Sequence, residues 1–323
     1  MIELRDIEDA AKRLEDVVIR TPLLQSAELD EIAGGKVLIK PECFQTIGSF
    51  KIRGAYNLIS QLSPEQASHG VVAWSSGNHA QGVALAGKLL GIKTTIVMPE
   101  DAPKLKPDRT RRLGAEVVLY DRYTGDREAI ARQIAAERGA EIVPSYDSEH
   151  IVAGQGTIGL EIMQQAAELG LVPDQVLTGC GGGGISSGMA VAVKALSPVT
   201  CFYAVEPEEF DSMTRSLQIG ERQGNAESAR SICDALLSEM PGELPFAIHR
   251  ELGTSGLAVS DAEVRAAIRF AFLHLKVVVE PGGAVSLAAV LENKIDCGDK
   301  TTAIVLTGGN IDPELFSEIQ NEK

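Results

Sequence analysis

The sequence predicts an α/β fold in which parallel strands alternate with helices. Short apolar runs rich in β-branched residues are separated by segments with helical periodicity, and this alternation continues along most of the chain. The 323 residues are enough for one large domain or two modest ones, each with its own core. No internal repeat or low-complexity segment is present, so the pattern indicates a globular α/β protein.

The first elements form a compact series. A strand is expected at Val37–Lys40. The next elements occupy residues 70 to 148: strand Gly70–Trp74, helix Gln81–Leu90, strand Thr94–Met98, a helix whose last turn Arg109–Leu113 ends at Gly114, strand Glu116–Tyr120, helix Asp126–Glu137 and an extended segment Glu141–Pro144. This block of short strands and helices has the size of a small domain.

The second half of the chain resumes the alternation. We expect a helix at Thr157–Leu169, a strand at Gln175–Thr178, a helix after Gly184, a strand at Cys201–Val205, a helix at Ala262–Leu275 and a buried strand at Thr302–Leu306.

Composition excludes several classes of protein. The formal net charge of −15 repels nucleic acids and anionic membranes. Charged residues interrupt every apolar run before it reaches the length of a membrane span, and the N-terminus has neither a signal-peptide nor a transit-peptide pattern. The five cysteines are scattered without Cys-x-x-Cys spacing, which favours free thiols over a disulfide framework or a zinc site. We therefore expect a cytoplasmic protein without nucleic-acid or membrane partners.

Three segments carry the chemistry. Lys51 stands in Ser49-Phe50-Lys51-Ile52-Arg53-Gly54-Ala55, and a lysine amine can form an imine with an aldehyde cofactor. Gly179-Cys180-Gly181-Gly182-Gly183-Gly184 joins a strand to a helix, where glycines allow backbone amides to approach a phosphate. Ser75-Ser76-Gly77-Asn78-His79-Ala80 opens another helix, whose free amides can bind a carboxylate. Together these segments predict a pyridoxal phosphate site.

Each segment also has a simpler interpretation. An isolated lysine at a helix start is usually a surface residue, and a glycine run can be a flexible turn. Serines before a helix are commonly N-caps, and a buried histidine is commonly held by a structural hydrogen bond. The combination of the three segments in one chain favours the cofactor site.

These segments, with Thr21-Pro22-Leu23 near the start and Leu306-Thr307-Gly308-Gly309-Asn310 near the end, resemble the serine/threonine dehydratases and serine racemases. That family belongs to the tryptophan-synthase-β-like, fold-type II class of pyridoxal phosphate enzymes. The resemblance implies a discontinuous large domain of residues 1–68 and 149–323, a small domain of residues 69–148, and the cofactor in the cleft between them. It also implies a homodimer or homotetramer.

The resemblance assigns roles to particular residues. Lys51 becomes the imine lysine and the base that removes the α-proton, and Phe50 packs against the cofactor ring. Asn78 bonds the ring hydroxyl, Thr307 faces the pyridine nitrogen, and the phosphate lies in the loop of Gly181, Gly182, Gly183 and Gly184. The substrate carboxylate is met by Ser75, Asn78, His79 and Arg127. Ser76 matches a second acid–base residue on the ring face opposite Lys51, and Glu280 is expected to border the site without an assigned role.

Glu206 resembles a carboxylate that holds Mg²⁺ or Ca²⁺ in racemases and some dehydratases, with the backbone carbonyl of Phe210 as a second ligand. The acid expected six residues after Glu206 is replaced by Ser212, and such cations need several oxygen ligands. A buried carboxylate bonded to backbone amides is an equal alternative, so the cation site stays open.

The predicted reaction is α,β-elimination from L-threonine or L-serine, a small β-hydroxy amino acid, giving a 2-oxo acid and ammonia. The chain ends at Lys323 without the length of the regulatory domain of biosynthetic threonine dehydratases, so we expect a role in amino-acid catabolism. Serine racemase and 3-hydroxyaspartate dehydratase are the alternative enzymes, and the latter needs a further cation for its second carboxylate. A silent amino-acid-binding homologue is the alternative outside enzymes.

Overall fold

The computed structural model describes residues 2–102, 105–121 and 123–322 and contains two sheets. The six-stranded sheet has the order β1 (Leu24–Gln25), β2 (Lys36–Pro41), β10 (Thr301–Leu306), β7 (Gln175–Gly179), β8 (Cys201–Pro207) and β9 (Ser255–Val259). The four-stranded sheet has the order β5 (Glu116–Tyr120), β4 (Thr94–Pro99), β3 (Val71–Trp74) and β6 (Glu141–Ile142). All neighbouring strands are parallel except β1 and β2, so the predicted α/β class is confirmed.

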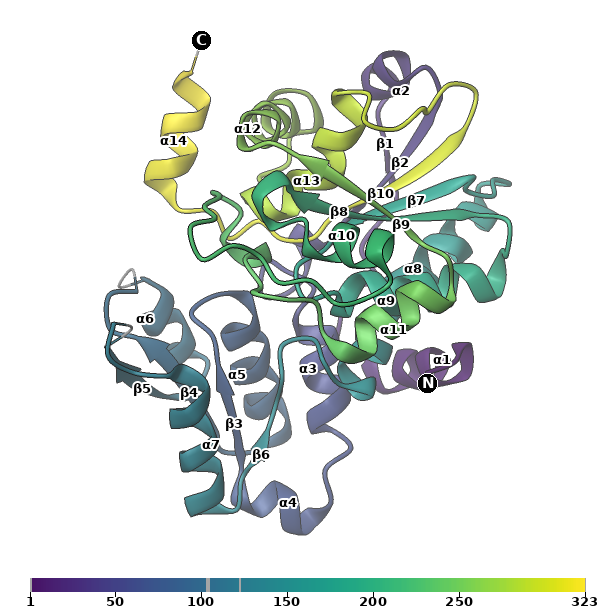
Figure 1. The fold of residues 1–323 in the computed structure, drawn as a ribbon. Helices are drawn as coiled ribbons and strands as arrows, with labels where there is room; N and C mark the ends of the chain where they lie inside the picture. Colours follow the sequence, from purple (N-terminus) through teal and green to yellow (C-terminus); the bar gives the residue numbers. More distant parts are fainter. Residues whose placement is uncertain (1, 103–104, 122, 323) are drawn as a thin grey trace.

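Helices cover both faces of both sheets (Figure 1). The helices of the N-terminal half are α1 (Leu4–Leu14), α2 (Ala27–Ala33), α3 (Ile52–Ile59), α4 (Pro64–His69), α5 (Asn78–Leu90), α6 (Leu105–Arg112), α7 (Arg127–Arg138) and α8 (Glu149–Glu168). Those of the second half are α9 (Gly184–Leu196), α10 (Ser212–Ile219), α11 (Glu243–Glu251), α12 (Asp261–Phe270), α13 (Pro281–Leu291) and α14 (Pro313–Asn321). Short 3₁₀ turns lie at Glu42–Phe44, Glu208–Phe210 and Asp234–Leu236.

Strand alternation divides each sheet between two cores. In β2, Val37 and Ile39 face a core shared with α12 and α13, while Leu38 faces one shared with α8 and α9. In the smaller sheet, Val71 and Ala73 pack with α3 and α5, while Val72 packs with α7. The strands are therefore buried on both faces, as parallel sheets require.

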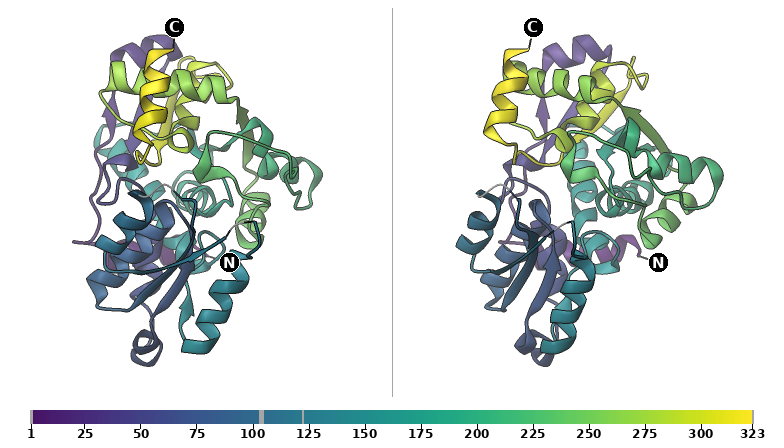
Figure 2. Two further views of the ribbon diagram at one scale, coloured as in Figure 1. Left: turned by 90° about the vertical axis from the view of Figure 1, so that its left-hand side faces the viewer. Right: turned by 60° about the vertical axis from the view of Figure 1, so that its left-hand side comes forward.

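The two sheets form separate bodies, one below the other in both views of Figure 2. The smaller sheet takes its strands from residues 71–142 and the larger from residues 24–41 and 175–306. The core of the smaller sheet also includes Ile52, Ala55 and Ile59 from α3, which precedes residue 69. The division at residues 68/69 and 148/149 stays a prediction.

Two helices predicted in the second half of the chain differ from those of the structure. The helix predicted at Thr157–Leu169 begins at Glu149, eight residues earlier. Gly154 and Gly156 interrupt its helical pattern, but there a Cβ would lie 2.7 Å from the Gly54 Cα and 2.7 Å from the Gly188 oxygen, respectively. Those glycines allow α3 and α9 to pack closely. The helix predicted to end at Leu275 ends at Phe270 and continues as a π turn, Ala271–Leu275.

A cluster of buried charges lies beneath the Lys51 segment. Arg53, on α3, forms ion pairs with Glu42 at 2.8 Å and with Glu161 of α8 at 2.7 Å. Lys40, on β2, pairs with the second oxygen of Glu161 at 2.5 Å. The side chains of Lys40, Glu42 and Arg53 are fully buried. The cluster ties α3 to α8 and to the larger sheet.

No helix in the described residues is long and apolar enough to cross a membrane.

Candidate active site

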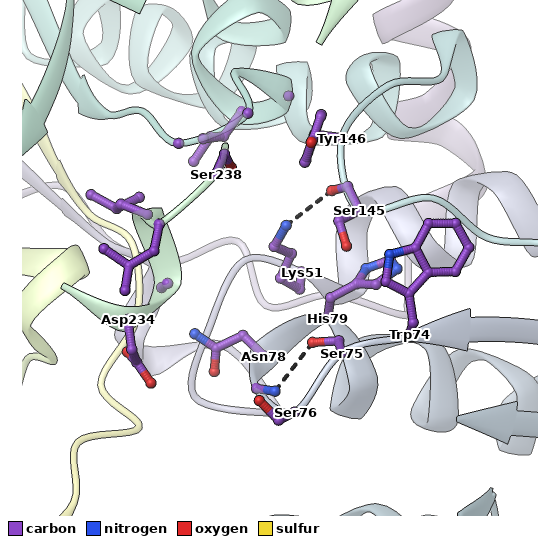
Figure 3. A pocket seen from close by; sticks show the side chains of 18 of the residues that line it. Lys51, Trp74, Ser75, Ser76, Asn78, His79, Ser145, Tyr146, Asp234 and Ser238 are labelled. Carbon is purple, nitrogen blue, oxygen red and sulfur yellow. Dashed lines mark hydrogen bonds between the residues drawn. The ribbon is translucent and has the colours of Figure 1, made fainter. Parts of the chain in front are cut away.

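A cavity of about 1170 Å³ lies where the carboxyl ends of strands from both sheets meet. β3 leads into residues 75–79, β7 into the glycine loop of residues 179–184, and β10 into residues 307–310, and each segment contributes to the wall. Ligands of open parallel sheets bind at this edge. Figure 3 shows Lys51 and the residues around it.

Lys51 immediately precedes α3 and reaches into this cavity. Its Nζ donates a hydrogen bond to the Ser145 carbonyl at 2.9 Å and lies 5.2 Å from the centre of the Phe50 ring. Burial lowers the pKa of Lys51 to about 8, although the nearby Glu280 carboxylate opposes the shift. A neutral, nucleophilic fraction of the amine is therefore present near physiological pH.

The glycine loop presents unused backbone donors. Gly183 has φ +95°, a conformation that favours glycine, and α9 begins at the next residue. In the described part of the chain, the backbone N–H groups of residues 181–186 meet no protein acceptor. A Cβ on Gly182 would lie 2.4 Å from the Tyr146 ring, so the loop also packs closely against the segment after β6. Several inward amides at a helix N-terminus match the needs of a phosphate.

The loop before α5 provides a second set of donors. The predicted helix start at Gln81 was late, because α5 begins at Asn78 with Gly77 as its N-cap. Ser75 is not the N-cap; its hydroxyl accepts a hydrogen bond from the Gly77 amide at 3.1 Å. Among the described residues, the amides of residues 78–80 have no protein acceptor, so this N-terminus can receive a carboxylate.

His79 is neutral. Its Nε2 lies 2.9 Å from the Val143 carbonyl, which can only accept, so Nε2 carries the proton. Burial and the neighbouring charge of Lys51 lower the pKa of His79 to about 3. His79 thus makes the structural hydrogen bond that was the simpler interpretation of this histidine in the sequence.

The other predicted residues line the same cavity. They are Phe50, Ser76, Asn78, Arg127 and Thr307. The Thr307 carbonyl accepts a hydrogen bond from the Phe50 amide at 3.2 Å, which joins the lysine segment to the end of β10. Arg127 is the first residue of α7, after the N-cap Asp126.

Sequence reasoning missed part of the wall. Tyr146, Asp234 and Ser238 also border the cavity (Figure 3). Lys106 borders it too, and its ion pair with Asp234 at 3.1 Å joins α6 to the 3₁₀ turn Asp234–Leu236. None of them stands in one of the three segments that the sequence analysis singled out. Asn310 is part of the last motif, Leu306-Thr307-Gly308-Gly309-Asn310, but nothing in the sequence indicated a role for it.

Glu206 and Phe210 lie outside this cavity. Glu206 is fully buried and accepts hydrogen bonds from the amides of Met213 and Thr214 and from the Thr214 hydroxyl, at 2.7 to 2.8 Å. Burial raises the pKa of Glu206 to about 7, and these donors oppose the rise. Within the described residues, no group of three or more His, Cys, Asp or Glu side chains could hold a metal ion. These contacts favour the structural alternative for Glu206.

Glu206→Gln tests this alternative. An amide cannot accept from all three donors, so we expect the variant to lose about 1–3 kcal/mol of stability. Neither wild type nor variant should gain melting temperature when Mg²⁺ or Ca²⁺ is added after chelation. A rise in wild type that Glu206→Gln lacks would establish a cation site instead.

The site and fold agree with the comparison to known proteins. Residues 14–308 match the model of the pyridoxal-phosphate dependent enzyme family, and the chain belongs to that family. The chain is 43% identical to the L-threonine ammonia-lyase of Thermotoga maritima, covering 100% of this chain and 79% of that protein. It is 44% identical to an L-threo-3-hydroxyaspartate ammonia-lyase of a Pseudomonas species, covering 97% of each chain.

A solved structure, maize serine racemase, superimposes with a TM-score of 0.92 at 35% identity, covering 98% of this chain and 96% of that one. The predicted fold-type II architecture and the predicted cofactor class are thereby confirmed.

The cavity fits the cofactor of this family. It combines a lysine amine, a glycine loop with free backbone amides and the buried side-chain amide of Asn78. The amine can bind the aldehyde of the cofactor, the backbone amides its phosphate, and the Asn78 side chain its ring hydroxyl.

Proposed function

We propose that the protein is a pyridoxal-phosphate dependent ammonia-lyase that eliminates water from small L-β-hydroxy amino acids, L-threonine and L-serine foremost. The observation that carries the proposal is Lys51, whose amine has a lowered pKa and lines the same cavity as the glycine loop and the N-terminus of α5. The similarity to two ammonia-lyases supports the reaction class.

Each residue has a stated task in this proposal. The bound cofactor supplies an electron sink that acidifies the substrate α-carbon. The amides of residues 181–184 hold the phosphate, Phe50 packs on the ring, and Asn78 and Thr307 meet the ring hydroxyl and nitrogen. Ser75, Asn78, His79 and Arg127 orient the substrate carboxylate, and Lys51 holds the cofactor and removes the α-proton.

The substrate is tested by a panel of amino acids. We expect L-threonine and L-serine to release 2-oxo acid and ammonia in a ratio of one to one. Both products are measured in the same reaction to check this ratio. L-threo-3-hydroxyaspartate belongs in the panel because the cavity wall carries arginines that could bind the second carboxylate of this substrate. In the described part of the chain, Arg109 and Arg127 line the cavity and form no ion pair with protein. No release from any member, despite bound cofactor, would favour a silent binding homologue.

Racemisation is the second candidate, because Ser76 lines the cavity on the loop before α5 while the Lys51 amine points toward Ser145 (Figure 3). We expect Ser76→Ala to slow α-proton exchange of D-serine in deuterated water about a hundredfold, as for a lost acid–base group. Elimination from L-threonine should survive at a substantial fraction of the wild-type rate.

Ser75→Ala is the matched control for this variant. It removes the hydroxyl that accepts a hydrogen bond from the Gly77 amide. It should therefore slow D-serine exchange and L-threonine elimination by similar factors. If Ser76→Ala halts L-threonine elimination and leaves D-serine exchange intact, the assignment of faces is reversed.

The assembly into two or four copies and the cytoplasmic location also stay predictions. The first is tested by light scattering and the second by cell fractionation.

A further inference from the structure

Three segments of the cavity wall are joined by a chain of side-chain hydrogen bonds. Asn310, after β10, donates from Nδ2 to the Ile47 carbonyl at 2.8 Å and to Oδ1 of Asn78 at 2.7 Å. Asn78, at the start of α5, donates from Nδ2 to Oε1 of Glu280 at 2.6 Å. Ile47 lies four residues before Lys51, and Glu280 immediately precedes α13. These hydrogen bonds therefore connect the lysine segment, the start of α5 and the larger sheet.

The bonds determine which way each amide faces. A backbone carbonyl can only accept, so the nitrogen of Asn310 must face Ile47. The same nitrogen also faces Asn78, which must therefore present its oxygen. The side-chain nitrogen of Asn78 then faces Glu280 and donates one of its two hydrogens to that carboxylate. Among the described residues, the second hydrogen of this nitrogen has no acceptor.

The surroundings leave this arrangement little freedom. Asn78 is 8% exposed and Glu280 is 4% exposed. A Cβ on Gly308 would lie 2.1 Å from Oε1 of Glu280, and the Glu280 amide donates to the Gly308 carbonyl at 3.0 Å. Burial raises the pKa of Glu280 to about 8, and its Oε1 can accept from Asn78 whether the carboxyl group is ionised or neutral.

We propose that Asn310 and Glu280 are positioning residues that aim the remaining N–H of Asn78 at the ring hydroxyl of the cofactor. The inference rests on the proposed role of Asn78. Without Asn310 the side-chain amide of Asn78 can rotate and present its oxygen to the cofactor. A neutral ring hydroxyl can donate a hydrogen bond to that oxygen, but an ionised ring oxygen cannot. Without an acceptor at position 280, the buried N–H of Asn78 loses its partner and competes for other contacts.

The test is the affinity of the apoenzyme for pyridoxal phosphate. Trp74 is the one tryptophan in the sequence and lines the cavity, so quenching of its fluorescence reports binding directly. We expect Asn310→Ala, Glu280→Met and Asn78→Ala each to raise Kd on the order of tenfold, the value of one lost hydrogen bond. Glu280→Gln keeps an acceptor oxygen and should remain close to wild type. Melting of each apoenzyme shows that it is folded.

A double-mutant cycle separates positioning from general destabilisation. In an Asn78→Ala background, Asn310→Ala should raise Kd no further, because its effect passes through Asn78. A cofactor analogue without the ring hydroxyl should bind wild type and Asn310→Ala alike. Additive effects, or equal losses with the analogue, would overturn the inference while leaving the role of Asn78 intact. An unchanged Kd for Asn78→Ala would instead refute the proposed role of Asn78, and the inference with it.

Discussion

Lys51→Ala is expected to abolish covalent attachment of the cofactor and to lower turnover of L-threonine about 10⁴-fold, the upper end of the range for a lost acid–base group. The reason is that one amine has two tasks in the proposed mechanism. It anchors the cofactor and removes the α-proton, and alanine can do neither. The measurement is borohydride trapping followed by mass analysis of the peptide that contains residue 51, together with initial rates of 2-oxo acid release.

Lys106→Ala is the matched control. It removes another lysine from the cavity wall, one that pairs with Asp234 at 3.1 Å. Borohydride should still fix the cofactor to Lys51 in that variant. Trapping at Lys106 in wild type, or near-normal turnover of Lys51→Ala, would contradict the assignment. Melting of the Lys51→Ala apoenzyme should stay near wild type, since among the described residues the amine makes a single hydrogen bond, to the Ser145 carbonyl.

Arg53→Met is expected to destabilise the fold by about 3–5 kcal/mol, the usual cost of removing one partner of a buried ion pair. The guanidinium contacts both Glu42 and Glu161, and methionine leaves these carboxylates with Lys40 as their remaining cation in the cluster. Equilibrium denaturation in urea, compared at equal cofactor saturation, measures the loss. Cofactor affinity should also fall, because Arg53 holds the start of α3 two residues after Lys51.

Arg20→Met supplies the comparison at the surface. Arg20 pairs with Glu168 at 2.7 Å, but both side chains are about half exposed, at 47% and 61%. We expect that variant to lose less than about 1 kcal/mol. Equal losses for the two variants would mean that the buried cluster contributes no more than an exposed pair.

Local pattern was sufficient for the fold class and for the outline of the site. Apolar runs such as Val37–Lys40 and Thr302–Leu306 predict buried strands, because successive side chains of a strand point to opposite faces of the sheet. The glycine loop was predictable because four consecutive glycines cost conformational entropy unless their conformations are used. Each of the predicted residues that resemblance placed at the cofactor or the carboxylate lines the one cavity described above.

Local pattern failed where long-range packing decides. The helix predicted to begin at Thr157 begins at Glu149, and Gly154 and Gly156 lie inside α8, where their missing side chains allow α3 and α9 to approach. For Glu206, the three donors that favour a structural carboxylate over a metal ligand come from residues seven or eight positions away, which the pattern around Glu206 does not show.

By itself, then, the sequence determined the α/β class, the alternation of the main strands with helices, and the three segments that suit a pyridoxal phosphate site. Tertiary structure alone decided how those segments are held. Asn78 is oriented by residues 202 and 232 positions away, and Arg53 is neutralised by Glu161, which is 108 positions away. The physical reason is that hydrogen-bond orientation and burial depend on which distant groups meet in space, and periodicity along the chain carries no record of those meetings.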